Sequence, residues 1–388
     1  MSMSQSYTAQ SALLPGRSLP SSHDDDLDST LGDDDSSGAE YCSATESIYD
    51  FRVENGRTYH AYMDGKYLFP NDEPSSKPSM GLQVVLRMDI VYQAITRIFN
   101  GKAFFAPVRH PHRVVDMGTG TGAWAIDVGD QYPEAHVIGI DLSPIQPKWV
   151  APNVEFRVDD IENPWAISRS ISLIHSRLMS GHSIRSWPNY LRECFSHLSP
   201  GGWVEAQEIS WLPLCSPSGP FPPESSILRW HSIFHRGMRN AGHNLCISAE
   251  DIARAMEEAG FINVRVHREI LPMGPWCSDR RMREAGTLVR ESVLQGIGGI
   301  SSAVFTRILG WGILDMELFL ERVRKEFRSK KIHGFWPLLV LHPSFFPCLP
   351  YPLLYIAEES RHFFNNLQRE VLKHHVQLVR KNYPQLTP

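Results

Sequence analysis

A glycine-rich turn between a short apolar strand and a helix constrains this chain of 388 residues more than any other feature. Residues 113–117 (RVVDM) have the β-branched composition of a strand, and Gly118-x-Gly120-x-Gly122 follows directly. Residues 123–132 then have a helical pattern that stops at a proline. Glycines at such a junction let the backbone turn tightly and approach a ligand without Cβ clashes. The junction therefore predicts a ligand-binding turn.

The residue two positions before the first glycine decides which ligand this turn suits. Read as Gly118-x-Gly120-x-x-Ala123, the glycines also satisfy a dinucleotide fingerprint. Asp116, however, would repel the pyrophosphate of a dinucleotide and would attract an ammonium group. The methionine moiety of S-adenosylmethionine (SAM) carries an ammonium group and no pyrophosphate. The pattern favours a SAM site, and the dinucleotide site is the weaker alternative.

Two more acids follow the next two predicted strands. Asp141 ends the strand at 135–140, where a carboxylate accepts both hydroxyls of an adenosine ribose in either kind of site. Asp160 closes the strand at 154–158, where it can accept from an adenine amino group. The carboxyl ends of parallel strands meet at one edge of a sheet, so we expect the three acids to share one crevice.

Strands and helices alternate along the chain, which predicts an α/β fold with a doubly wound, mostly parallel sheet. The expected strands lie at residues 113–117, 135–140, 154–158, 171–175, 203–209 and 261–267. The expected helices lie at residues 82–99, 123–132, 187–198 and 248–260, and residues 275–330 look helical with a Gly-rich interruption at 296–299.

Composition divides the chain into four parts. Residues 1–45 hold eight acids and one base, with few large apolar residues, and are expected to be a disordered tail. Residues 46–111 are an aromatic arm and a cap helix, and residues 112–340 are the SAM-binding domain. Residues 341–388 combine a Pro-rich apolar segment with an amphipathic helix pattern at 358–383. Whether this last part is a genuine extension or a gene-model artefact stays open.

The charge distribution gives no evidence for nucleic acid or a membrane as a partner. The acidic tail accounts for more than the net charge of −5, so residues 46–388 are close to neutral and give no argument for nucleic acid or membrane. Five prolines in the uncharged run 335–357 argue against a membrane helix.

The chain has no HExxH motif and no CxxC pair, so we expect no metal site. We expect a cytoplasmic protein; the basic cluster at 322–331 leaves the nucleus as the alternative.

Several segments together resemble the class I SAM-dependent methyltransferases. They are VVDMGTGTGAWAID, VIGIDLSPIQP, PNVEFRVDDIENPW and LSPGGWVEAQEI. The upstream stretch ENGRTYHAYMDGKYLFPNDE is similar to the N-terminal region of the fungal LaeA-like group in particular. The resemblance implies a seven-stranded Rossmann-like sheet with a helical N-terminal arm and α-rich C-terminal additions, SAM as cofactor, and a link to fungal secondary metabolism.

The resemblance also implies roles for single residues. Asp116, Gly118, Gly120 and Gly122 would hold the methionine and backbone side of SAM, Asp141 with Leu142 the ribose, and Asp160 with Ile161 the adenine. Tyr67 and Tyr59 belong to the matched arm and would close over the site or pack on the sheet. The family's D-x-I-H-x-R pattern has Ser172 in place of the aspartate here, with His175 and Arg177 retained.

Catalysis needs few groups, because methyl transfer is an in-line displacement with an already activated leaving group. A general base is required only for a weakly acidic acceptor. The candidate bases lie at the carboxyl ends of the fourth and fifth strands and are His175, His182, Glu205 and Glu208. For each of them a structural role is the alternative.

Two functions fit these observations. The first is a methyltransferase that acts on a small-molecule intermediate of secondary metabolism. The second is a LaeA-like regulator that binds SAM and works through protein partners of the velvet type. A nicotinamide-dependent oxidoreductase is disfavoured by Asp116 and by the lack of a Tyr-x-x-x-Lys pair.

Overall fold

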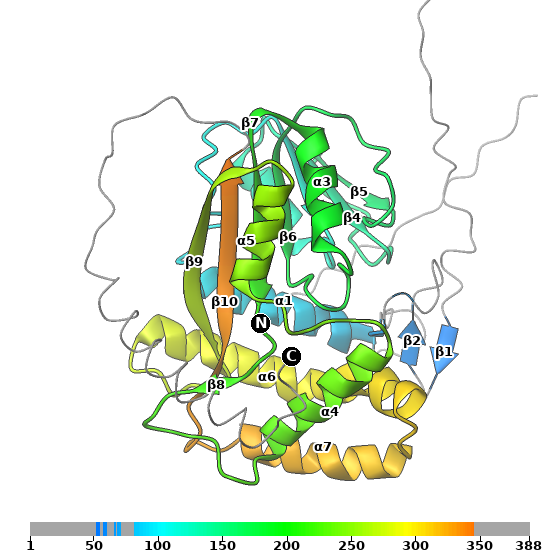
Figure 1. Ribbon diagram of the computed structural model, residues 1–388, viewed down its shortest axis with the longest axis vertical. Coiled ribbons are helices and arrows are strands. Elements are labelled where there is room, and N and C mark those ends of the chain that lie inside the picture. Colours follow the sequence, from blue (N-terminus) through cyan, green and yellow to red (C-terminus); the bar gives the residue numbers. More distant parts are fainter. Residues whose placement is uncertain (1–51, 55–56, 60–65, 67, 71–80, 345–388) are drawn as a thin grey trace, which may run out of the picture. The chain divides into compact units, whose positions relative to one another are not determined.

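The fold is described from a computed structural model (Figure 1). It describes residues 52–54, 57–59, 66, 68–70 and 81–344. The acidic tail, Tyr67 and the helix expected at 358–383 lie outside the described residues.

A single large sheet organises the chain, and its strand order is β5-β4-β3-β6-β7-β10-β8, with β9 paired to β10. Strands β3 to β7 run parallel, whereas β10 is antiparallel to both β7 and β9. The strands are β3 (Arg113–Met117), β4 (His136–Asp141), β5 (Val154–Val158), β6 (Ile171–Arg177), β7 (Leu198–Ile209), β8 (Leu214–Cys215), β9 (Ile262–Pro272) and β10 (Gly334–Ser344). Seven long strands with the two-residue β8 at one end confirm the predicted doubly wound, mostly parallel sheet. A separate hairpin joins β1 (Arg52–Glu54) to β2 (Arg57–Tyr59).

The Pro-rich apolar run begins with strand β10, for which the sequence predicts no strand. Its two prolines argue against a strand, because proline normally avoids the interior of a sheet. Pro337 has no N–H to donate, but its carbonyl accepts from the Ser210 N–H at 2.9 Å. Pro343 lies where the pairing with β9 shifts register, between His342 and Ser344. The strand lies between β7 and β9 and continues past residue 340.

Helices cover both faces of the sheet. They are α1 (Gly81–Ile98), α2 (Ala123–Gln131), α3 (Trp187–His197), α4 (Ser226–Asn240), α5 (Ala249–Glu258), α6 (Arg280–Ala303) and α7 (Ile313–Phe327), with a π-helical turn at Val304–Ile308. Val115, Ile138 and Ile174 pack with α3 and α5, which lie in front of the sheet in Figure 1, and their chain neighbours on the other face pack with α2. This alternation along each strand is the period-two pattern of a sheet buried on both faces.

Helix α6 corrects a second prediction, because it runs through the glycines at 296–299 without interruption. The side chain of Arg87 lies over Gly296, and that of Arg57 lies over Gly299. A Cβ at Gly296 would overlap the aliphatic part of Arg87. The glycines therefore make room for arginine side chains from other segments, and this is a packing role that outweighs their low helix propensity.

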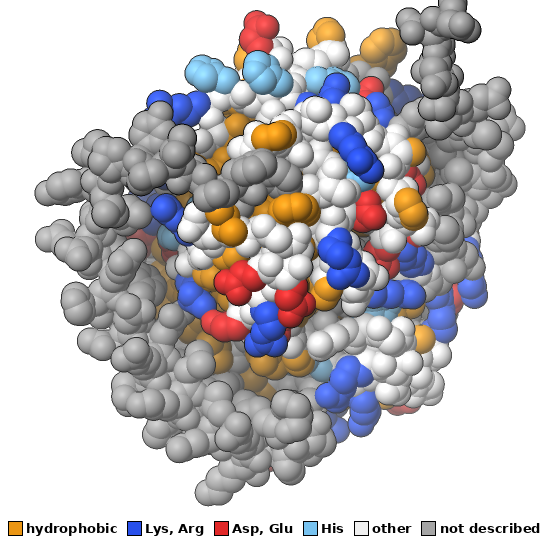
Figure 2. All heavy atoms as spheres, turned by 45° about the horizontal axis from the view of Figure 1, so that its top comes forward, with side chains coloured by type: hydrophobic (Ala, Val, Ile, Leu, Met, Phe, Trp, Pro, Cys, Tyr) orange, Lys and Arg blue, Asp and Glu red, His pale blue; other side chains and the backbone are white. Residues whose placement is uncertain are grey.

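A second core lies beyond the carboxyl ends of the parallel strands. Helices α1, α4, α6 and α7 pack there on one another and on β10 (Figure 1). On the described part of the face in Figure 2, acidic and basic side chains are interspersed. Two arginines at the C-terminal end of α7 are paired: Arg324 lies 3.1 Å from Glu317, and Arg328, which follows the helix, lies 3.3 Å from Glu321. None of the helices in the described ranges combines the length and the apolar character of a membrane-spanning segment.

Candidate functional site

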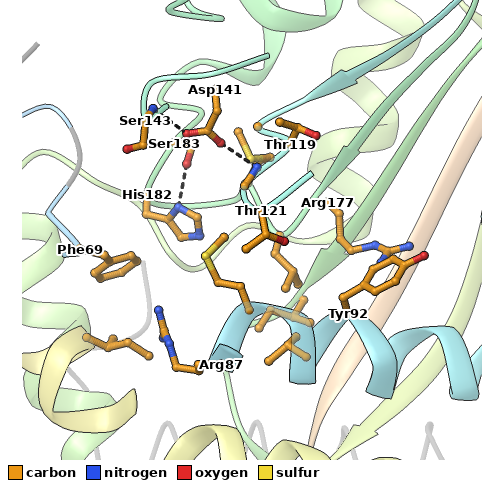
Figure 3. Close-up of a pocket in the computed structure, with 18 of the residues that line it drawn as sticks. Phe69, Arg87, Tyr92, Thr119, Thr121, Asp141, Ser143, Arg177, His182 and Ser183 are labelled. Atoms are coloured by element: carbon orange, nitrogen blue, oxygen red, sulfur yellow. Dashed lines mark hydrogen bonds between the residues drawn. The ribbon is translucent and has the colours of Figure 1, made fainter. Parts of the chain in front are cut away.

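A cavity of about 300 Å³ opens between the carboxyl ends of β3, β4 and β6 and the helices α1, α4 and α6 (Figure 3). Its two halves differ in chemistry. The half at the sheet is polar and contains Asp116, Gly118, Gly120, Asp141, Leu142, Asp159, Asp160 and Ile161. The half at the helices is mostly apolar and contains Val91, Ile209, Trp211, Trp230, Val289, Val293, Ile297, Phe327 and Trp336.

The glycine turn from β3 into α2 forms one wall of the polar half. Gly118, Gly120 and Gly122 have φ angles of +70°, +58° and +83°, which are strained for any residue with a Cβ. The Gly118 N–H donates to the Ile140 carbonyl at 2.8 Å, so the turn is tied to β4. A Cβ at Gly122 would overlap the ring of Phe156. Gly122 therefore serves the packing of the turn, whereas Gly118 and Gly120 face the cavity.

Asp116 lines the cavity and is held by two partners. Its Oδ1 lies 2.7 Å from Nδ1 of His175, and its Oδ2 accepts from the Thr119 hydroxyl at 2.7 Å. The His175 ring is fully buried and stacks on Trp124 with the centroids 3.7 Å apart and the planes at 3°. Burial lowers the pKa of His175 more than the bond to Asp116 raises it. The neutral ring therefore donates its Nδ1 hydrogen to the carboxylate, which can only accept.

Asp141 joins the end of β4 to the glycine turn. Its Oδ2 accepts from the Gly120 N–H at 2.9 Å, and its Oδ1 accepts from the Ser143 N–H at 3.0 Å (Figure 3). Leu142 also lines the cavity. These contacts fix the carboxylate at the position that the sequence predicts for a ribose-binding acid.

Asp160 is buried in the cavity wall, and Ile161 lies beside it. Its carboxylate pairs with the Lys66 ammonium and accepts from the Glu162 N–H at 3.0 Å. Lys66 also lies 3.2 Å from a carboxylate oxygen of Glu162. Lys66 could not be predicted from the sequence, because a single lysine in a charged, tyrosine-rich segment gives no signal of its own.

Of the four candidate bases, the two histidines line the cavity. His175 is engaged with Asp116, as described above. His182 has its Nδ1 2.8 Å from the Ser183 hydroxyl, and its ring meets the ring of Phe69 edge to face (Figure 3). Burial is the main cause that lowers the pKa of His182 to about 3, so this side chain is neutral at pH 7.

The two glutamates are not among the described residues that line the cavity. Glu205 accepts from the N–H groups of Phe105 and Ala106, both at 2.7 Å. Glu208 accepts from the N–H groups of Met179 and Ser180, at 3.1 and 2.8 Å. Desolvation raises the pKa of both carboxyls to about 7. These contacts support a structural role for both, and their nomination as bases stays a prediction.

The apolar half of the cavity could not be predicted from the sequence either. Trp230 lies on α4, Val289 and Val293 lie on α6, and Phe327 ends α7. Apolar residues at helical spacing are expected in any helix that packs on a core, so the sequence pattern could not separate a cavity wall from a core.

Two histidines of α4 form an HxxxH pair near a cysteine. His231 and His235 stand four residues apart on the helix, and Nδ1 of His235 lies 3.2 Å from the Cys246 sulfur. Within the described residues there is no group of three or more His, Cys, Asp or Glu that could hold a metal ion.

The fold and the site together define a class I SAM-dependent methyltransferase, as the sequence predicts. Residues 90–266 match the model of a methyltransferase domain. The chain is 36% identical to methyltransferase pytC of Aspergillus terreus over 328 residues, which cover 81% of this chain and 94% of pytC. It is 36% identical to the secondary metabolism regulator laeA of Aspergillus flavus, over 74% of this chain and 75% of laeA.

A third relative is the protein-methionine methyltransferase laeA of Emericella nidulans, which is 32% identical over 74% of each chain. The chain therefore belongs to the family of fungal methyltransferases that includes pytC and the laeA regulators.

Proposed function

We propose that this protein transfers a methyl group from SAM to a small apolar molecule of fungal secondary metabolism. One observation carries the proposal: the glycine turn with its acids and a wall of aromatic and aliphatic side chains line the same cavity. A methyl donor and an apolar acceptor can thus meet out of contact with bulk water.

The residues of the polar half fit SAM. A carboxylate offers about four acceptor positions, so Asp116 keeps capacity beyond its bonds to His175 and Thr119. Asp116 would hold the ammonium group and Asp141 the ribose hydroxyls. Asp160 with Ile161 would flank the adenine, where Lys66 now pairs with the carboxylate. SAM, when bound, supplies a methyl group on a sulfonium sulfur that is ready to leave.

The remaining work of the protein is positioning and the exclusion of water. His175 and Thr119 fix the Asp116 carboxylate from the side of the sheet. Trp211 and Trp230 belong to the wall that closes the acceptor half. Such a site accelerates methyl transfer by holding the two reactants together and dry, and these are effects that need no ionisable catalyst.

The relatives named as regulators support a second function, in which this fold acts through protein partners such as velvet-type proteins. The identity to laeA is as high as that to pytC, but the matched region covers 75% of laeA against 94% of pytC. The fuller match and the apolar cavity favour the action on a small molecule.

Calorimetric titration of the full-length protein with S-adenosylhomocysteine (SAH) tests the proposal, with NADPH in parallel. We expect SAH to bind with a dissociation constant near the micromolar range and NADPH not to bind. Asp116→Asn should weaken SAH binding at least about tenfold, whereas Asp130→Asn, at an exposed position of α2, should change it less than about twofold. Binding of NADPH, or equal affinity of all three proteins for SAH, would contradict the proposed site.

A further inference from the structure

The two residues that hold the Asp141 carboxylate are themselves held by one side chain, that of Gln146. Oδ2 of Asp141 accepts from the Gly120 N–H at 2.9 Å, and Oδ1 accepts from the Ser143 N–H at 3.0 Å (Figure 3). The carbonyl oxygens of the same two residues accept from Nε2 of Gln146, at 2.6 Å for Gly120 and 2.9 Å for Ser143. The four hydrogen bonds therefore close a ring from Asp141 through Gly120, Gln146 and Ser143 and back to Asp141.

The Gln146 amide suits this place in the ring. Its nitrogen carries two hydrogens, and each of the two carbonyl oxygens can accept one of them. A carboxylate at this position would instead place acceptors against acceptors, and an apolar side chain would leave both carbonyls without this donor. An amide therefore fixes both residues at once, and its carboxylate counterpart cannot.

Gly120 needs a support from outside the turn. Its φ of +58° belongs to the region that favours glycine, and a Cβ there would overlap the end of the Met88 side chain. The base of the turn is tied to β4, because the Gly118 N–H donates to the Ile140 carbonyl at 2.8 Å. Gln146 ties the Gly120 carbonyl to the segment after β4, and this fixes the direction in which the Gly120 N–H points at Asp141.

Gln146 acts from behind the cavity wall. Asp141, Gly120 and Ser143 line the cavity, whereas Gln146 is not among the described residues that do so. The side chain therefore reaches a bound ligand through Asp141 and the glycine turn. Hydrogen bonds to a carboxylate weaken steeply when their direction is wrong, so a support that fixes the carboxylate also fixes what it can bind.

We propose, building on the proposed function, that Gln146 is a positioning residue that orients the Asp141 carboxylate toward the ribose hydroxyls of the cofactor. Its contribution is specific for one part of the ligand. Removing the amide should weaken the recognition of the two hydroxyls and leave the contacts with the adenine and with the amino acid part of the cofactor in place.

Calorimetric titration of the full-length protein with SAH and with its 2′,3′-dideoxy analogue tests this assignment. The analogue lacks the two hydroxyls and keeps the rest of the ligand. We expect the unmodified protein to bind SAH at least about tenfold more tightly than the analogue, because hydrogen bonds to a carboxylate are charge-assisted.

Three variants connect this preference to the proposed residue. Gln146→Met keeps the length of the side chain without its donors, and it should weaken SAH binding about tenfold while the affinity for the analogue changes less than about twofold. Gln146→Glu, which replaces the donors by acceptors, should show the same pattern. Gln131→Met, at an exposed position at the end of α2, should keep both affinities.

The comparison of the two ligands separates a positioning role from general support of the loop. A loop anchor would weaken both ligands by the same factor when it is replaced, and this result in Gln146→Met and Gln146→Glu would overturn the proposal. Unchanged binding of SAH by both variants would overturn it as well. Equal affinity of the unmodified protein for the two ligands would instead contradict the ribose site at Asp141, and with it the role of Gln146.

Discussion

Asp116 and His175 are direct partners on the neighbouring parallel strands β3 and β6, and their side chains meet at 2.7 Å on one face of the sheet. Glu205 continues the same row, because it is the partner of His175 on β7. The row thus contains three ionisable side chains, of which the outer two are acids. His175 holds the acid that faces the cavity, and this supports a positioning role for it rather than a role as a base.

Replacing His175 tests that role. His175→Gln removes the Nδ1 donor and the ring that stacks on Trp124, so Asp116 loses its fixed orientation. We expect the dissociation constant of SAH to rise about tenfold, which is typical for the loss of an orienting partner. Calorimetry measures the affinity, and thermal denaturation measures the stability of the same samples.

The matched control is His197→Gln, which changes a buried histidine on α3 away from the cavity. This variant should lose stability but keep its affinity for SAH. If His175→Gln also lost only stability, His175 would be a plain core residue.

Gly122→Ala tests the tight turn. The new Cβ would adopt a φ near +83° and overlap the Phe156 ring, so conformational strain and overpacking both act. Together they should lower the free energy of unfolding by roughly 2–4 kcal/mol, as measured by urea denaturation.

Gly201→Ala separates the two effects, because Gly201 has a φ of +80° but no atom within 4 Å of the position of a Cβ. This variant should lose only about 1–2 kcal/mol from the conformation. Equal losses in the two variants would show that the contact with Phe156 contributes nothing.

Alanine should raise the free energy of unfolding at Gly298 of α6 and lower it at Gly296 of the same helix. At Gly298 the nearest atoms are the flexible ends of Arg324 and Glu317, at 3.3 and 3.4 Å, so alanine should add up to about 1 kcal/mol through its better helix propensity. At Gly296 alanine has to displace Arg87, and the free energy of unfolding should fall. Urea denaturation of both variants measures the difference, and stabilisation by Gly296→Ala would contradict the described packing of Arg87.

The buried glutamates should make stability depend on pH. Burial raises the pKa of Glu205 and of Glu208 from 4.5 to about 7 in the folded protein. Between these pH values the folded state keeps protons that the unfolded state has lost. The free energy of unfolding should therefore fall as pH rises from 4.5 to 7, by up to about 1.4 kcal/mol per pH unit for each group.

Glu208→Gln should reduce the dependence of the free energy of unfolding on pH by the contribution of one carboxyl group. Urea denaturation at several pH values measures this dependence. Glu257→Gln, at an exposed position of α5, provides the control and should leave the slope unchanged. A slope in Glu208→Gln equal to that of the unmodified protein would mean that Glu208 is ionised throughout this range.

Local sequence signals were sufficient for much of the fold. The strand composition at 113–117 and the helical pattern at 248–260 both correspond to observed elements. Strand β10 could not be predicted because Pro337 and Pro343 break the rules for an interior strand, and its place follows from its pairing with β7 and β9.

Local sequence signals likewise predict only part of the site. An acid at the end of a strand is visible in sequence, so Asp116, Asp141 and Asp160 could be placed in one crevice. The direction of a side chain such as Glu205 depends on the loop that packs against it, here at Phe105 and Ala106, about 100 residues away in the chain. No spacing rule contains such a contact.

Methylation of a small apolar molecule can be measured by incubating the full-length protein with SAM carrying a radiolabelled methyl group and a metabolite extract of a filamentous fungus. After separation of protein from an organic extract, we expect label in the extract, with Asp116→Asn reducing it and Asp130→Asn leaving it unchanged. Label that appears in protein alone, or in neither fraction although SAH binds, would show that the protein does not methylate such a molecule.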